Sequence, residues 1–137
     1  MTAYVLDASL AAAWFLPDEA SGAADRLLAD ILANSPLVPS LFRHEVRNLL
    51  LVAERRDRLS ASDVDEALIK LATLPIAVRD VGGDRDVLML ARKYGLTAYD
   101  PAYLALALAE RLPLATLDKR LAAAARAEKA PLIGPLA

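Results

Sequence analysis

Short apolar runs alternate with longer segments of helical periodicity along this chain, and that alternation constrains the fold more than any other feature. The runs that predict strands are residues 3–6, 37–38, 76–78, 114–116 and 132–133. The segments that predict helices are residues 8–15, 18–33, 40–56, 62–73, 84–94, 100–112 and 118–128. Strands that alternate with helices pair in parallel, and the connecting helices cover both faces of the sheet. We therefore expect an α/β fold, a short parallel β-sheet flanked by helices on both faces.

Length and composition bound the class of protein. A chain of 137 residues is typical of one domain, here residues 1–137. The apolar fraction of 56% exceeds the roughly 45–50% of soluble domains, so we expect a partner or a second copy to cover part of the surface. The net charge of −2 argues against nucleic-acid binding by overall charge. Any phosphate must then be contacted by local basic patches or by a bound metal.

Several chemistries are excluded by residues that the chain lacks. Without cysteine there are no disulfides, thiolate nucleophiles or cysteine-ligated zinc sites. The single histidine, His44, leaves little room for a Ser-His-Asp triad. No apolar run approaches the roughly 18–20 residues of a membrane span, and the N-terminus lacks the basic region of a signal peptide. We expect a cytoplasmic protein that does not bind membranes.

Four acidic residues stand at equivalent points of the predicted fold. Asp7 and Asp118 each follow a strand, Asp100 begins a helix, and Glu45 lies in the second turn of the helix after residues 37–38. In an open parallel sheet, helix N-termini and strand ends gather at one edge, where ligands bind. We therefore predict that these four carboxylates meet.

Structural roles explain the acids one at a time but not together. Aspartate is a common helix cap, and Asn, Ser or Thr would serve equally well in that role. Glu45 shares a helical face with three apolar residues, Leu41, Leu49 and Val52, so it needs an arginine partner or a cation. Four clustered carboxylates would repel one another unless a cation lies between them. Oxygen ligands suit Mg²⁺ or Mn²⁺, and such an ion supports phosphodiester hydrolysis.

Four strings of residues then match a known family in order and spacing. Residues 4–9 (YVLDAS) resemble the opening of PIN-domain ribonucleases, and residues 41–50 (LFRHEVRNLL) resemble their second motif. Residues 96–107 (LTAYDPAYLALA) closely resemble the third motif, and residues 115–121 (ATLDKRL) the fourth. Together the strings run from residue 3 to about residue 121.

The short form of the chain is similar to VapC-type toxins of bacterial toxin–antitoxin pairs. That resemblance implies a PIN-like fold and a Mg²⁺- or Mn²⁺-dependent endoribonuclease that cuts cellular RNA. It also implies a homodimer, held inactive by a cognate VapB-like antitoxin. The family's four acids correspond to Asp7, Glu45, Asp100 and Asp118, which are the expected catalytic and metal-binding residues. A Ser or Thr near the first and fourth acids often supports metal or water there, which points to Ser9 and Thr116.

Two other interpretations compete with the nuclease. One is a PIN-like domain that binds a partner and leaves its metal site idle. The other is a phospho-receiver domain, for which Asp80 and Lys119 are the nearest candidate residues, although it leaves Glu45 unexplained. Outside the acids, packing is the preferred role for Tyr99 and Tyr103, and His44 is expected at the surface without a catalytic role. Arg43 and Arg47 are expected to be solvated surface residues. Arg55, Arg56 and Arg58 are expected at a helix C-terminus, where the helix dipole favours cations.

Overall fold

A computed structural model of the chain describes residues 3–19, 21–81 and 83–137. The strands are β1 (Ala3–Leu6), β2 (Ser35–Val38), β3 (Ala77–Val78), β4 (Leu114–Ala115) and β5 (Leu132–Ile133). The helices are α1 (Ala8–Ala13), the 3-10 turn η1 (Pro17–Glu19), α2 (Gly22–Ala29), α3 (Phe42–Arg55), α4 (Ala61–Thr73), α5 (Asp84–Tyr94), α6 (Asp100–Glu110) and α7 (Lys119–Ala127). The predicted alternation of strands and helices is confirmed.

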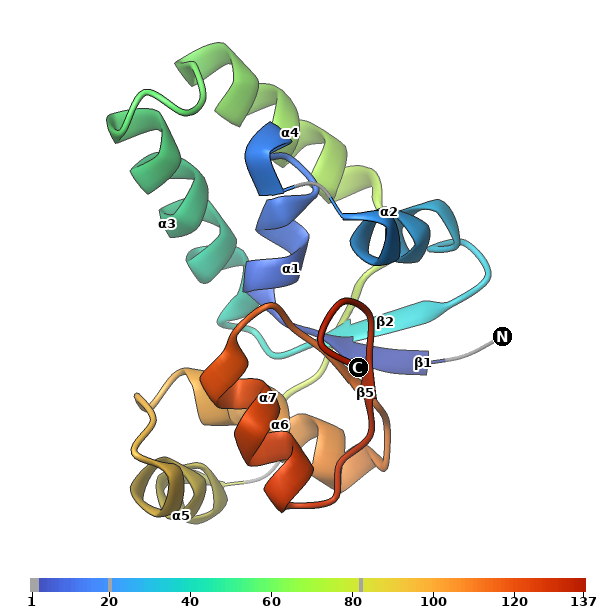
Figure 1. Cartoon of the computed structure of the whole chain (residues 1–137), viewed down its shortest axis with the longest axis vertical. Coiled ribbons are helices and arrows are strands. Elements are labelled where there is room, and N and C mark those ends of the chain that lie inside the picture. The colour runs from blue at the N-terminus through green and yellow to red at the C-terminus, as the bar shows by residue number, and fades with distance from the viewer. Residues whose placement is uncertain (1–2, 20, 82) are drawn as a thin grey trace.

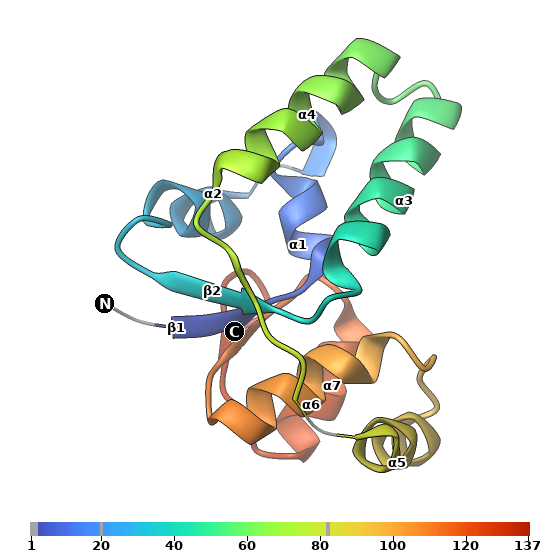
Figure 2. The ribbon, with the colours of Figure 1, turned by 180° about the vertical axis from the view of Figure 1, so that it is seen from behind.

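All five strands pair in parallel in the order β3-β2-β1-β4-β5. Helices α1 to α4 lie on one side of the sheet, and α5, α6 and α7 lie on the other (Figures 1 and 2). The predicted α/β/α architecture is therefore confirmed. Because β1 and β4 are neighbours and parallel, the residues that follow them, Asp7 and Asp118, leave the sheet at the same edge.

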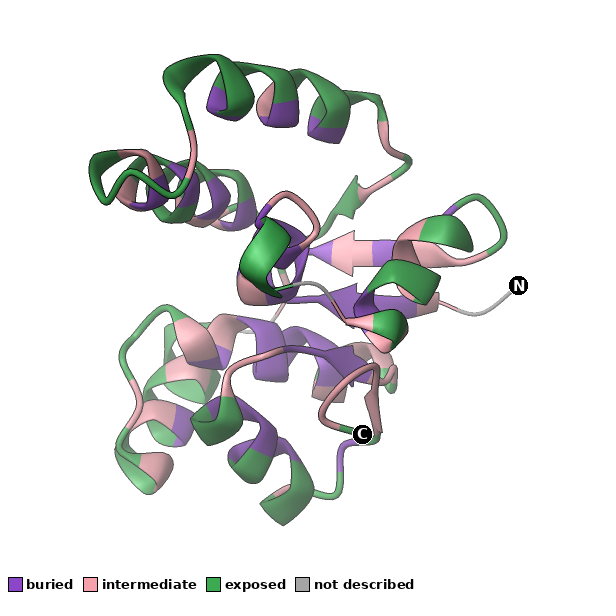
Figure 3. Ribbon diagram, turned by 45° about the horizontal axis from the view of Figure 1, so that its top comes forward, coloured by how far each residue is buried: buried purple, intermediate pink, exposed green. Residues whose placement is uncertain are grey.

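The core is built on the central strand and on α6. Tyr4, Val5 and Leu6 of β1 are fully buried, because helices cover both faces of that strand. Helix α6 is buried at successive positions from Tyr103 to Ala107, as its nearly uniform apolar sequence predicts. Figure 3 shows the buried residues on the sheet and on the helix surfaces turned toward it. Among the described residues, no helix is long and apolar enough to cross a membrane.

Several predicted helix ends depend on local hydrogen bonds. The αL conformation at Gly95 (φ 63°) ends α5 as predicted, since glycine adopts it without a Cβ clash. Ser60 begins α4 in a capping box with Asp63. The predicted helix over 18–33 is wrong at both ends, because α2 begins only after Ser21, whose Oγ accepts from the Ala24 N–H, and ends at Ala29. Leu32, predicted on an inner face, is consequently 86% exposed.

Helix α3 faces the core with a different stripe from the predicted one. Its buried residues are Phe42, Val46, Leu50 and Ala53. Glu45 is only partly buried beside that stripe, and it lies in the first turn because α3 begins at Phe42. The carboxylate is therefore at the border of the core, open to one side.

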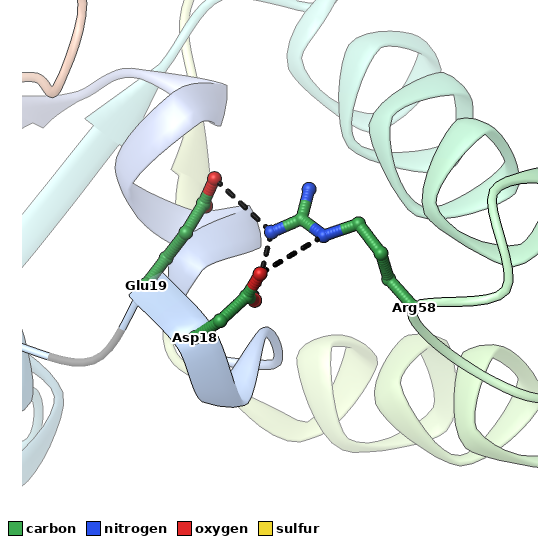
Figure 4. Close-up of polar contacts among 3 residues, drawn as sticks. All are labelled: Asp18, Glu19 and Arg58. Atoms are coloured by element: carbon green, nitrogen blue, oxygen red, sulfur yellow. Dashed lines mark hydrogen bonds and ion pairs between the residues drawn. The ribbon is translucent and has the colours of Figure 1, made fainter.

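Arg58 lies beyond the end of α3, so the predicted helix-terminus role does not apply to it. Its Nη2 lies 2.8 Å from Oδ1 of Asp18 and 3.4 Å from Oε1 of Glu19 (Figure 4). These ion pairs join η1 to the connection between α3 and α4. They lie at the surface, where such pairs contribute little stability individually.

Candidate functional site

A pocket of about 600 Å³ opens at the edge of the sheet where β1 and β4 end. It is lined by Asp7, Ala8, Ser9, His44, Glu45, Asn48, Leu49, Tyr99, Asp100 and Asp118. All four acids predicted to meet are among these residues. Each lies next to the start of a helix or in its first turn, where the helix dipole favours negative charge.

Asp7 is the most buried of the four acids, with 5% of its surface exposed. It occupies the N-cap position of α1 but makes no side-chain cap bond. Its Oδ2 instead accepts hydrogen bonds from Ser9 Oγ (2.5 Å) and Thr116 Oγ1 (2.6 Å). Burial raises the pKa of Asp7 to about 6; the two hydroxyls lower it, and Asp100 and Asp118 raise it further. Capping does not explain this aspartate.

The two hydroxyls also fix the neighbouring backbone. Ser9 Oγ accepts from the Leu117 N–H at 3.0 Å, and Thr116 Oγ1 accepts from the Asp118 N–H at 2.9 Å. Each hydroxyl therefore joins the end of β1 to the end of β4. Ser9 lines the pocket, whereas Thr116 is fully buried behind it.

Glu45 is held by a residue that the sequence suggested only for packing. The hydroxyl of Tyr103, fully buried in α6, donates to Glu45 Oε1 at 2.5 Å. Partial burial raises the pKa of Glu45, the Tyr103 hydrogen bond lowers it, and the charges of Asp7 and Asp100 raise it again. Since Tyr103 lies one turn after Asp100, α6 both supplies one acid and orients another.

Asp100 and Asp118 differ in their local roles. Asp118 caps α7, because its Oδ1 accepts from the N–H groups of Arg120 (2.9 Å) and Leu121 (3.2 Å). Asp100 is the first residue of α6 rather than its cap, and its own N–H donates to Thr97 Oγ1 at 3.4 Å. Burial first, and then the charge of Asp118, raises the pKa of Asp100.

The carboxylate oxygens of the four acids are chemically suited to a hard divalent cation. Every acidic ligand candidate offers carboxylate oxygen, which Mg²⁺ and Mn²⁺ prefer. Within the described part of the chain, however, no three acidic or histidine side chains are arranged so that they could hold a metal ion as they stand. Joint binding therefore requires the side chains to move toward one another. Burial is the main cause of the raised pKa values of Asp7, Glu45 and Asp100, and neighbouring carboxylates raise them further; this repulsion would fall as a cation entered.

The rim of the pocket includes residues that sequence reasoning did not assign. His44, Asn48 and Leu49 line it from α3, and the exposed Tyr99 lines it from the start of α6. The three α3 residues could have been predicted from their spacing. Asn48 and Leu49 lie three and four positions after Glu45, one helical turn away, and His44 is the residue before it. Expected at the surface, His44 is exposed, and its Nδ1 lies 2.8 Å from Arg47 Nη2.

The two receiver-type candidates do not enter this pocket. Asp80 is exposed after the edge strand β3, where its Oδ1 accepts from the Ser40 N–H. Lys119 is exposed in the first turn of α7. Neither lines the pocket that holds the four acids, so the receiver interpretation is not supported.

Comparison with known proteins identifies the family. The model of the PIN domain matches residues 4–127, nearly the whole chain. The chain belongs to the PIN-domain family. It is 35% identical to Ribonuclease VapC3 of Pyrobaculum aerophilum over an alignment of 121 residues that covers 86% of this chain and 91% of that protein. Among PIN-domain proteins it is thus of the VapC type.

A solved structure supports the same assignment. The crystal structure of PAE2754 from Pyrobaculum aerophilum superposes with a TM-score of 0.68 and 27% sequence identity. The match covers 90% of this chain and 79% of that one. The two folds therefore correspond over most of the parallel sheet and its helices.

Proposed function

We propose that this PIN-domain protein is a ribonuclease toxin that hydrolyses RNA phosphodiester bonds with the help of Mg²⁺, for which Mn²⁺ can substitute. One observation carries the proposal: residues from four separate elements bring four carboxylates to the lining of one pocket. Such an arrangement is unfavourable without a cation, because burial raises the pKa of Asp7 and the charges of Asp100 and Asp118 raise it further. The name of the relative, Ribonuclease VapC3, supports RNA as the substrate.

In this proposal the ion is bound by Asp7, Asp100, Asp118 and Glu45. A bound divalent cation would lower the pKa of an attacking water and neutralise charge on the phosphoryl oxygens. The chain's own residues orient the ligands. Asp7 uses Oδ2 for its two hydroxyl partners, and its Oδ1 makes no hydrogen bond to any described residue. Asp118 similarly uses Oδ1 as a helix cap.

Ser9 and Thr116 act in this proposal by holding Asp7. Both donate to the same oxygen, and both also accept a backbone N–H from the segment after β4. Their contribution is to fix one carboxylate relative to the Asp118 backbone, which preorganises the ligand set. A direct bond from Ser9 or Thr116 to metal or water is not needed for this role.

The proposal extends to partners and organisation. We infer that residues 1–137 form a single PIN domain that acts in the cytoplasm as a homodimer. A cognate VapB-like antitoxin neutralises it by covering the acidic pocket. Exposed apolar side chains such as Leu88 and Met89 on α5 support a surface that a partner covers.

The test is RNA cleavage by the purified, antitoxin-free chain with Mg²⁺, with Mn²⁺ or with EDTA. Asp7→Asn and Asp100→Asn should abolish cleavage, whereas Asp65→Asn on the exposed face of α4 should not. Binding of Mn²⁺, followed by electron paramagnetic resonance, should weaken in the first two variants only. Cleavage that persists in folded Asp7→Asn protein would refute the assignment. Metal binding without cleavage of pooled cellular RNA would favour a partner-binding PIN domain instead.

A further inference from the structure

The pocket is larger than its acids and a cation require. Six waters around an ion fill roughly 200 Å³, at about 30 Å³ each. The pocket encloses about 600 Å³, which is within the range of small-molecule sites. The remaining space lies beside the acids, so it can take a part of the substrate other than the reacting phosphate.

The lining of that space favours an uncharged, flat group. Ala8, Leu49 and Tyr99 give the pocket an apolar wall, and none of the described residues that line it is an arginine or lysine. A second phosphate would therefore meet carboxylates with no lysine or arginine, and only His44 as a basic side chain, among the described lining residues. A nucleobase is flat, uncharged and apolar on both faces, and it fits this lining better.

Tyr99 is placed to stack on such a base. It is 64% exposed although it is a large aromatic side chain, and it lines the pocket directly before Asp100. Its backbone is fixed at the start of α6, where its N–H donates to Thr97 Oγ1 at 3.3 Å. A base on this ring would lie within about one nucleotide of the phosphate at the acids, because Tyr99 and Asp100 are adjacent in the chain.

Asn48 faces the same space from α3. It lies one turn after Glu45, and its carboxamide makes no hydrogen bond to any residue in the described ranges. A carboxamide offers both donors and an acceptor, which is the combination that reads a base edge. The exposed carboxamide of Asn48 is therefore available to a base edge in the pocket that Tyr99 also lines.

We propose that Tyr99 and Asn48 form a nucleobase subsite beside the acids, in which Tyr99 stacks on an unpaired base next to the scissile phosphate and Asn48 reads its edge. The subsite gives the enzyme a preference for single-stranded RNA and for particular bases at one position. This inference rests on the proposed ribonuclease function. It assigns substrate contacts to residues that the metal site does not use.

The first experiment measures cleavage of a randomised single-stranded RNA and sequences the product ends. Tyr99→Ala should lower kcat/KM roughly 5- to 140-fold, the effect expected for the loss of one base–aromatic stack. Tyr99→Phe keeps the ring, so its kcat/KM should fall little. Tyr99→Leu keeps only apolar bulk, so its kcat/KM should fall about as far as that of Tyr99→Ala. Asn48→Ala should flatten the base preference at a single position. Ile69→Ala, an exposed apolar change on α4, is the matched control.

A second experiment separates failure of this subsite from failure of the proposed function. Fluorescence anisotropy measures binding of labelled oligo-rA and oligo-rU to Asp7→Asn protein, with and without Tyr99→Ala. Weaker binding with Tyr99→Ala supports the subsite even if the wild type cuts no tested RNA. Equal binding and an unchanged cleavage pattern overturn the subsite and leave the nuclease intact. Unchanged RNA binding with impaired inhibition by a protein partner also overturns it, since the surface would then recognise a peptide.

Discussion

Replacing Asp7 with asparagine should stabilise the metal-free protein at neutral and alkaline pH. Burial raises the pKa of this carboxyl from 3.8 to about 6. That difference corresponds to about 3 kcal/mol of destabilisation by the ionised form. The carboxamide introduced by Asp7→Asn retains a carbonyl oxygen that can accept from Ser9 and Thr116, so most of this penalty should disappear in the variant.

The pH dependence gives the sign of the effect. Because the folded-state pKa of Asp7 is raised, the folded protein binds the proton more tightly than the unfolded chain does. The wild type should therefore lose stability as pH rises from about 4 to about 6, and should remain at the lower value above that range. Asp7→Asn should not show this loss of stability. The free energies of unfolding of the two proteins should therefore differ most above pH 7 and least near pH 4.

Urea unfolding in EDTA measures this difference directly. An advantage of about 3 kcal/mol moves the midpoint of a small domain by roughly 1 to 3 M urea. Asp65→Asn, at an exposed position on α4, controls for the change of net charge. Mg²⁺ should then close the gap, because a ligand that binds only the folded wild type stabilises it by about 2.7 kcal/mol at 100 times its dissociation constant. At 1,000 times that constant the gain is about 4.1 kcal/mol, and the order should reverse. A variant less stable than the wild type at pH 8 in EDTA, or a gap that does not narrow toward pH 4, would refute the reasoning.

Three further outcomes are expected. Tyr103→Phe should weaken Mn²⁺ binding roughly 10-fold or more, because it removes the hydrogen bond that orients Glu45. A Mn²⁺ titration followed by electron paramagnetic resonance measures this change. Thr116→Val removes a hydrogen bond to Asp7, so it should destabilise the protein by about 1–3 kcal/mol and raise the pKa of Asp7 further. Thr116→Ser keeps the hydroxyl, so its stability and the pKa of Asp7 should stay near the wild-type values. Unfolding curves measured across pH distinguish the two variants. Gly95→Ala should cost about 1 kcal/mol in urea unfolding, because φ is 63° there, and an unchanged midpoint would show that the left-handed cap is dispensable.

The parts of the fold and site that the sequence predicts are those set by local pattern. Asp7 and Asp118 follow apolar strands, and parallel pairing of those strands necessarily puts both at one edge. The ends of α2 were not predictable from periodicity, because the Ser21 cap decides where it begins. The hydrogen bond from Tyr103 to Glu45 joins residues 58 positions apart, so it depends on where the fold places α6 relative to α3, on the other side of the sheet. A helical pattern carries no information about such a distant partner.

The pocket rim shows the same division. Tyr99 precedes a motif acid, but whether its ring packs inward or stays exposed is decided by the turn at the start of α6. Glu45 was placed on an apolar stripe that proved to be displaced around α3, because Phe42 and Val46 are the residues that meet the core. Side-chain direction at these positions follows from packing between elements.

The hydroxyl link between the ends of β1 and β4 has a consequence for a newly synthesised chain. Asp7 emerges from the ribosome early, whereas Thr116 and Asp118 lie 109 and 111 residues later in the chain. The strand pair in which Val5 aligns with Leu114 likewise joins distant parts of the chain. Contacts of such long sequence separation form late in folding. The acidic pocket is therefore unfinished throughout most of translation. A chain that could cut RNA would remain harmless to the message and ribosome producing it until its final quarter had been made.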